Sequence, residues 1–128
     1  MKILFDTHIY FWWVTGDRKL PPAMRRMVED SSIEALMSAV IPWELATKSR
    51  LGKWPSARRV LDEIEGVLEG GTLVRLPITT VHARIAGLFP VDHRDPFDRM
   101  LAAQAKCEGV PLVTVDAVFR NFDIEILS

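Results

Sequence analysis

The chain has 128 residues, of which 48% are hydrophobic and 26% are charged, a balance that is typical of a globular protein and excludes a disordered or collagen-like chain. At this length one hydrophobic core can form without disulfides or a structural metal. The 16 Lys and Arg residues against 17 Asp and Glu residues give a formal net charge of -1, which excludes a protein that binds nucleic acid through overall charge alone.

The first half of the chain alternates short apolar runs with helical patterns. The runs at residues 3–5 and 35–38 are too short for helices and indicate buried strands. Pro22 and Pro42 suit the first turn of a helix, where the missing N–H group has no partner to lose. Glycines mark the ends of two helices. The predicted order is strand 3–5, helix 7–14 ending near Gly16, a helix from Pro22 with Met24, Met27 and Val28 on one side, strand 35–38, and a helix around Pro42 ending near Gly52.

The second half contains the clearest amphipathic pattern in the chain. Apolar residues recur at helical spacing between Ser56, a candidate N-cap, and the Gly70-Gly71 pair, which predicts one helix. Its buried stripe is expected to comprise Val60, Leu61, Ile64, Val67 and Leu68. Further predicted elements are an edge strand or connector at 73–76, a helix carrying Val81, Ile85, Leu88 and Phe89, a helix from Asp95-Pro96 to Gly109, and strands at 112–115 and 124–127.

Short apolar strands separated by helices indicate an α/β domain with helices on both faces of the sheet. No repeat or Gly/Ser/Pro-rich linker divides the chain, so residues 1–128 are expected to form one domain. The single cysteine, Cys107, cannot form an internal disulfide, and Asp6 comes too early for a secretory signal. No apolar run approaches the ~20 residues of a membrane-spanning helix. These features predict a cytoplasmic protein that does not act in a membrane.

Acidic residues follow the predicted strands, at the sheet edge where α/β proteins bind ligands. Asp6 and Asp116 directly follow strands, Glu44 lies in the first turns of the next helix, and Asp98 opens another helix. Carboxylates on one rim repel one another, and a divalent cation relieves that repulsion. Oxygen ligands suit Mg²⁺ or Mn²⁺, whereas no Cys/His spacing in the chain indicates zinc.

Each acid also has a structural interpretation. The two acids that directly follow strands could cap the turns after them. Glu44 has Lys48 four residues on, the ordinary spacing of a surface ion pair. Asp95 and Asp98 have the spacing of a helix cap around Pro96. The helical stripe that carries Glu44 is partly apolar, however, and a bound metal explains a carboxylate there better than a lysine partner alone.

The four acids lie in four short motifs. These are Asp6-Thr7-His8 with Trp12-Trp13 and Thr15-Gly16-Asp17, Ser38-Ala39-Val40 with Trp43-Glu44-Leu45-Ala46, His93-Arg94-Asp95-Pro96-Phe97-Asp98-Arg99, and Thr114-Val115-Asp116. In order, spacing and residue type they resemble the PIN-domain ribonucleases, and within that family the VapC-type toxins of toxin–antitoxin pairs. One departure is Ile41-Pro42, where many relatives have a small hydroxyl residue that caps the Glu44 helix.

The resemblance implies a three-layer α/β/α sandwich with a mostly parallel sheet, a Mg²⁺ site that Mn²⁺ can also fill, and endonucleolytic cleavage of RNA. It further implies a homodimer and a small cognate antitoxin that blocks the site. Asp6 and Asp98 are the expected direct metal ligands, while Glu44 and Asp116 bind a second ion, hold a coordinated water or accept its proton. Candidates for hydrogen bonds to these carboxylates or their waters are Thr7, Ser38 and Thr114.

Other residues near the motifs have two interpretations each. The basic residues either contact the RNA backbone or form solvated helix surface: Lys48, Arg50, Lys53, Arg58, Arg59, Arg94 and Arg99. The tryptophans either stack on bases or belong to the core or to a protein interface: Trp43, Trp54 and Trp12-Trp13. Asp95 is expected to cap its helix, and His93 is either a general acid or a packing residue.

Three other functions remain open. A PIN-type nuclease could process RNA or act on DNA, because these residues do not distinguish substrates. A non-catalytic binding module of the same fold could act through protein contacts, although the presence of all four acids argues against it. A hydrolase with an aspartyl-phosphate at Asp6 is disfavoured, because such enzymes commonly place a second Asp where His8 stands.

Overall fold

The computed structural model describes all of residues 1–128 and contains one sheet of five strands. The strands are β1 (Lys2–Phe5), β2 (Glu34–Ser38), β3 (Leu73–Leu76), β4 (Leu112–Val113) and β5 (Ile126–Leu127). The α-helices are α1 (Thr7–Thr15), α2 (Pro22–Glu29), α3 (Val40–Arg50), α4 (Ala57–Asp62), α5 (Ile64–Glu69), α6 (Thr80–Leu88) and α7 (Pro96–Glu108), and η1 (Ala117–Asn121) is a 3-10 helix.

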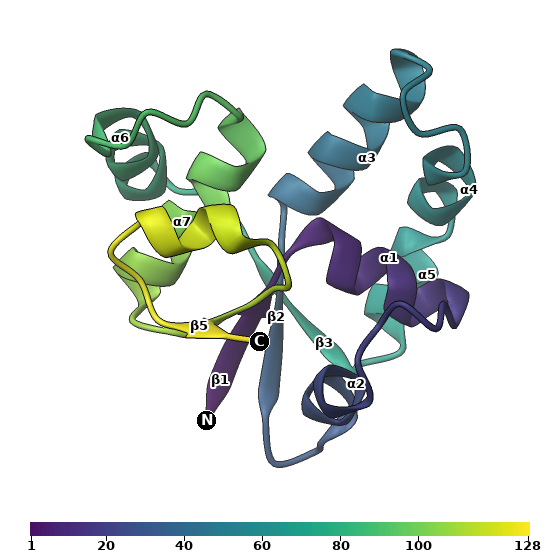
Figure 1. Cartoon of the computed structure of the whole chain (residues 1–128). Helices are drawn as coiled ribbons and strands as arrows, with labels where there is room; N and C mark the ends of the chain where they lie inside the picture. Colours follow the sequence, from purple (N-terminus) through teal and green to yellow (C-terminus); the bar gives the residue numbers. More distant parts are fainter.

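The sheet has the order β3-β2-β1-β4-β5, and every neighbouring pair is parallel. Helices α1, α2, α4 and α5 lie on one side of it and α6 and α7 on the other, while α3 rises from the end of β2 (Figure 1). The expected α/β/α sandwich is therefore confirmed, with a sheet that is wholly rather than mostly parallel. The helices lack the combination of length and apolar content that a membrane-spanning helix requires.

Strand β1 lies at the centre of the sheet, and this position accounts for its uninterrupted run of apolar residues. Ile3, Leu4 and Phe5 are at most 1% exposed, because helices cover both faces of the strand. Leu4 pairs in register with Leu36 of β2 and Leu112 of β4. The carboxyl ends of these three strands consequently meet at one edge, and the residues that follow them come together there.

The amphipathic stripe after Ser56 forms two helices instead of the one predicted. Backbone hydrogen bonds continue across the junction at Glu63, from Glu63 N to Arg59 O and from Val67 N to Glu63 O, so the break is a local bend. The bend lets α4 pack against α3 while α5 packs against β3. Ser56 forms no capping hydrogen bond, which corrects its expected role.

Helix α6 also turns a different face inward than its apolar spacing predicts. Val81 and Leu88 are 53% and 66% exposed, whereas His82 and Ala86 are buried. His82 can be buried because its polar atoms have partners: its N–H donates to the Thr79 hydroxyl and its Nδ1 accepts the Thr79 N–H. A capping box therefore outweighs the apolar pattern in setting the rotation of this helix.

Candidate active site

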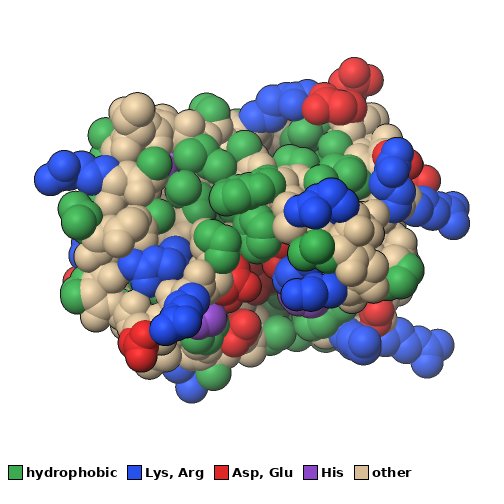
Figure 2. Space-filling model, turned by 90° about the horizontal axis from the view of Figure 1, so that it is seen from above, with side chains coloured by type: hydrophobic (Ala, Val, Ile, Leu, Met, Phe, Trp, Pro, Cys, Tyr) green, Lys and Arg blue, Asp and Glu red, His purple; other side chains and the backbone are tan.

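A small polar hollow of about 100 Å³ lies at the carboxyl edge of the sheet. Its lining is Asp6, Thr7, His8, Glu44, Lys48, Asp95, Asp98 and Asp116, and we call it the acidic pocket. Seen from above, acidic side chains occupy the centre of this face, with Lys and Arg side chains on either side (Figure 2). The structure thus brings together all four acids that the sequence singles out.

Asp6 combines a capping role with a position in the acidic pocket. It is the N-cap of α1, with a carboxylate oxygen that accepts the Ile9 N–H at 3.0 Å, and the Thr114 hydroxyl donates to its other oxygen. The side chain is only 6% exposed. Burial raises the pKa of Asp6, and this effect exceeds the opposing effect of the bonds from Thr114 and Ile9. A positive charge nearby would therefore favour the carboxylate form.

Glu44 is buried on α3 between two donors. The Thr7 hydroxyl lies 2.5 Å from its Oε1, and Lys48 forms an ion pair with its Oε2. Burial opposes the charge on Lys48, but the hydrogen bond and charge of Glu44 outweigh it and raise the pKa of the ammonium. The ion-pair interpretation is thus confirmed, inside the acidic pocket instead of on an open surface. Lys48 partly neutralises the cluster of carboxylates.

Asp98 lies in the first turn of α7, where His93 holds it. The His93 Nε2 is 2.8 Å from the Asp98 Oδ2. Burial first, and then the charges of Asp95 and Glu44, raise the pKa of Asp98 to about 6 against the opposing hydrogen bond from His93. Asp95 accepts the N–H groups of Phe97 and Asp98 at 2.8 and 3.2 Å, which confirms its capping role.

Asp116 is the most open of the four acids. Its carboxylate accepts the Val118 N–H at 3.0 Å and so caps η1. Its own N–H donates to the Thr114 hydroxyl at 3.0 Å. Thr114 therefore links Asp6 and Asp116, one on each of two neighbouring strand ends.

Residues 3–125 match the PIN domain family. The chain belongs to that family. It is also similar to Ribonuclease VapC22 of Mycobacterium tuberculosis (strain ATCC 25618 / H37Rv), with 29% identity over 122 residues that cover 93% of this chain and 90% of the relative.

Solved structures show the same fold. DNA-bound VapBC from Salmonella typhimurium superposes with a TM-score of 0.70 and 24% identity, covering 99% of this chain and 97% of the other. VapBC2 from Rickettsia felis, bound to a DNA fragment from its promoter, has a TM-score of 0.66 and 15% identity, covering 99% and 98% of the two chains. The PIN fold is thus supported along the whole chain.

Ser38 does not contact the carboxylates of this PIN domain, which corrects its predicted role. Its hydroxyl donates to the Gln104 Oε1 and accepts the Val40 N–H at 3.0 Å. Gln104 is fully buried and donates to the Pro77 carbonyl. Ser38 consequently satisfies an N–H of the first turn of α3, which compensates for the missing hydroxyl residue at the start of that helix.

Arg99 is the second correction among the predicted site residues. Its guanidinium is occupied by backbone carbonyls of residues 86–93 and is not free to bind an RNA phosphate. Arg50 and Arg94, by contrast, are exposed. They remain candidates for contacts with the RNA backbone.

His8 lines the acidic pocket, although no motif in the sequence predicts a role for it. Its ring stacks on the Trp54 ring, with centroids 4.9 Å apart. The Trp12 ring is tilted relative to the His8 ring, and their centroids are 5.7 Å apart. Both tryptophans are half-buried against the core. The available signal was its place in the first turn of the helix that Asp6 caps.

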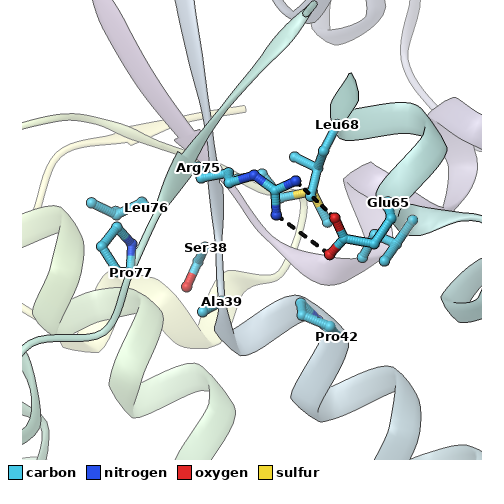
Figure 3. A pocket seen from close by; sticks show the side chains of 10 residues that line it. Ser38, Ala39, Pro42, Glu65, Leu68, Arg75, Leu76 and Pro77 are labelled. Carbon is cyan, nitrogen blue, oxygen red and sulfur yellow. Dashed lines mark hydrogen bonds and ion pairs between the residues drawn. The ribbon is translucent and has the colours of Figure 1, made fainter. Parts of the chain in front are cut away.

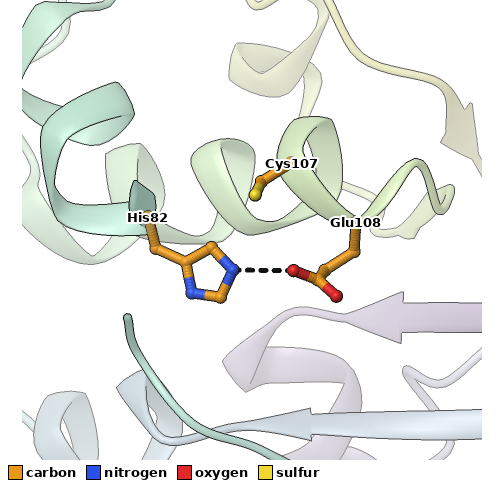
Figure 4. A group of neighbouring side chains, drawn as sticks. All are labelled: His82, Cys107 and Glu108. Atoms are coloured by element: carbon orange, nitrogen blue, oxygen red, sulfur yellow. Dashed lines mark hydrogen bonds and ion pairs between the residues drawn. The ribbon is translucent and has the colours of Figure 1, made fainter. Parts of the chain in front are cut away.

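Two other groups of side chains differ in chemistry from the acidic pocket. One hollow, of about 380 Å³, lies between α5, β3 and the start of α3, and the paired Arg75 and Glu65 side chains lie beside its mostly apolar wall (Figure 3). The other group is His82, Cys107 and Glu108 (Figure 4), whose ligand atoms lie within 4.8 Å of one another.

The second group does not suit a metal. Because the His82 Nδ1 accepts the Thr79 N–H, the proton of the neutral ring lies on Nε2, which donates to Glu108 at 2.9 Å. The nitrogen that faces Cys107 and Glu108 therefore has no lone pair to offer. These residues form a structural contact between α6 and α7.

Proposed function

We propose that this protein is a magnesium-dependent endoribonuclease that acts as the toxin of a toxin–antitoxin pair, with residues 1–128 working as one PIN domain. The observation that carries the proposal is the acidic pocket, where Asp6, Glu44, Asp98 and Asp116 meet at one edge of the sheet. The ribonuclease named among its relatives covers nearly the whole chain, and this supports the reaction class.

The acidic pocket fits a hard divalent cation. Its acids offer only oxygen, the ligand that Mg²⁺ and Mn²⁺ prefer. Burial raises the pKa of Asp6 and of Asp98, so the positive charge near these carboxylates does not offset the cost of burying them in ionised form. Asp6 and Asp98 would hold the ion, and Glu44 and Asp116 would contact it directly or through water.

The bound ion would supply a water of lowered pKa and would neutralise charge on the phosphate under attack. The residues of the chain divide the remaining work. Thr114 orients Asp6, and Thr7 orients Glu44, through hydroxyl donors. Asp116, exposed at the rim, would accept a proton from the attacking water. Lys48 can exchange its bond to Glu44 for one to a phosphate oxygen.

RNA binding requires local positive charge because the chain is near neutral overall. Arg50 and Arg94 are exposed, and Lys and Arg side chains flank the acidic centre in Figure 2. Contacts of this kind fix the RNA backbone without reading its sequence. A homodimer and a small antitoxin that blocks the acidic pocket complete the proposal, and the VapBC assemblies among the structural neighbours support the antitoxin.

The test is cleavage of a mixed pool of structured RNAs by purified protein with Mg²⁺, with Mn²⁺ and with a chelator. Fragments that need the metal and that the Asp98→Asn variant does not produce are the expected result. Metal-dependent cuts in a DNA pool alone would replace RNA as the substrate class. Absence of cleavage in both pools under every metal would favour a binding module.

A further inference from the structure

All of the hydrogen bonds that the Arg99 side chain donates go to backbone carbonyls. A guanidinium has five N–H donors. In this structure Nε donates to one carbonyl, and Nη1 and Nη2 donate to two each. The acceptors are the carbonyls of Ala86, Val91, His93, Gly87 and Phe89, at 2.9, 2.8, 2.9, 3.4 and 2.7 Å.

These carbonyls have no partners in regular structure. Two belong to the last turn of α6, where the carbonyls have no N–H donor within the helix. The other three lie in residues 89–95, the α6–α7 connection, which forms neither helix nor strand. One side chain from the first turns of α7 thus fixes the course of the connection that precedes its own helix.

The connection leads directly to the metal site of the proposed function. The His93 carbonyl accepts a hydrogen bond from the Arg99 Nη1 at 2.9 Å. The Nε2 of the His93 ring bonds the Asp98 Oδ2 at 2.8 Å. Its ring also meets Phe122 edge-on, with centroids 6.3 Å apart. The backbone and the ring of His93 are therefore each held, and Asp98 lies at the end of this chain of contacts.

We infer that Arg99 is a positioning residue that holds residues 86–93 so that His93 keeps Asp98 in the orientation a metal ligand requires. This inference rests on the proposed function. Lysine keeps the charge but places three donors on a single atom, so it cannot reach five carbonyls spread around a planar fork. Arg99→Lys therefore removes the geometry and leaves the charge.

The experiment measures Mn²⁺ binding by calorimetry, amide hydrogen exchange, and RNA binding at several salt concentrations for the wild type, Arg99→Lys, His93→Ala and Arg94→Ala. Arg99→Lys is expected to speed exchange over residues 86–94 and to weaken Mn²⁺ binding by ~10-fold or more, the size typical of lost support to a metal ligand. His93→Ala is expected to weaken Mn²⁺ binding similarly without faster exchange over 86–91. Arg94→Ala is the matched control: it should leave Mn²⁺ binding unchanged and lower the salt dependence of RNA binding.

Each of the following results would overturn the inference. Faster exchange in Arg99→Lys with Mn²⁺ affinity equal to that of the wild type makes Arg99 a structural residue only. Weaker RNA binding in Arg99→Lys, again with unchanged Mn²⁺ affinity, makes it a phosphate contact, because lysine keeps the charge but not the planar fork that binds a phosphate. If Arg99→Lys does not fold, unchanged Mn²⁺ affinity in His93→Ala overturns the inference and leaves the proposed function standing. Wild-type protein that binds no Mn²⁺ overturns the proposed function as well.

Discussion

The two expected metal ligands, Asp6 and Asp98, are held by different kinds of structure. Asp6 continues the pairing of β1 with β4, since its N–H donates to the Val113 carbonyl at 3.2 Å and its side chain accepts from Thr114. Asp98 lies in the first turn of α7, and its side chain bonds His93, a residue of the α6–α7 connection without regular structure. The backbone of Asp6 is thus paired with a neighbouring strand, whereas the side chain of Asp98 is bonded by one residue of an irregular connection.

Because of this difference, the Asp98 side of the acidic pocket is the more sensitive to substitution. In the β1–β4 ladder, loss of one hydrogen bond leaves its neighbours in place. In the α6–α7 connection, one substitution at Arg99 removes five bonds together. Substitutions outside the acids should therefore affect the Asp98 side of the acidic pocket more than the Asp6 side.

The largest expected effect comes from removing either ligand charge. Asp6→Asn and Asp98→Asn should each lower metal-dependent RNA cleavage by more than about 100-fold, because each removes an oxygen that we propose binds the ion directly. Both variants should remain folded by circular dichroism, since amides fit where burial already disfavours the charge. Asp92→Asn, an exposed acid of the α6–α7 connection, is the control. Full cleavage by either ligand variant contradicts the site.

A smaller effect is expected when one support of Asp6 is lost. Thr114→Val keeps the side-chain shape but removes the hydroxyl that donates to Asp6 and accepts the Asp116 N–H. We expect cleavage to fall about 10-fold, the lower end for such supports, because the backbone of Asp6 stays paired with β4. Steady-state cleavage rates against Thr72→Val, an exposed threonine outside the acidic pocket, provide the measurement. A loss as large as that of Asp6→Asn would show that the ladder alone does not hold the ligand.

The sequence predicts the sheet side of the site better than the connection side. Apolar runs that end in acids at Asp6 and Asp116 directly encode strands and the edge at which they meet. The acceptors of Arg99 are backbone carbonyls, which every residue carries, so no pattern of side chains reveals them. For the same reason Arg99 resembled an RNA contact in the sequence.

Other differences arise from packing between distant segments. The bend at Glu63 follows from two packing partners, α3 and β3, that the amphipathic stripe cannot distinguish. The bond between Ser38 and Gln104 joins residues separated by 66 positions. Glu44 shows that two interpretations of one residue can both hold, because its bond to Lys48 and its place in the acidic pocket coexist.

The raised pKa of Asp98 predicts how pH changes the stability of the metal-free protein. Its carboxyl holds a proton up to a pKa of about 6 in the folded chain, against an ordinary value of 3.8, because it is buried and faces Asp95 and Glu44, with His93 opposing. The folded state thus binds more protons between these values, so stability falls as pH rises through this window. We expect a loss of about 1–2 kcal/mol after solvent screening.

Urea unfolding at pH 4 and pH 7 measures this change. Asp98→Asn should reduce the pH dependence and leave a remainder from Asp6, whose pKa burial also raises. Mg²⁺ should stabilise the wild type at pH 7 more than at pH 4, since only the ionised carboxylate binds the ion. Equal stabilisation by Mg²⁺ at both values, or the same slope in Asp98→Asn, would place the titrating group elsewhere.

The smallest expected effect tests the packing beneath the Asp6 side. Tyr10, on the helix that Asp6 caps, is 1% exposed, and its hydroxyl is buried without a hydrogen-bond partner. Burial, with a contribution from Glu63, raises its pKa to about 12. Because an unpaired buried hydroxyl is costly, Tyr10→Phe should leave the free energy of unfolding unchanged or raise it by up to about 1 kcal/mol. Urea unfolding decides this, and destabilisation would mean that the hydroxyl supports α1 and, through it, the position of Asp6.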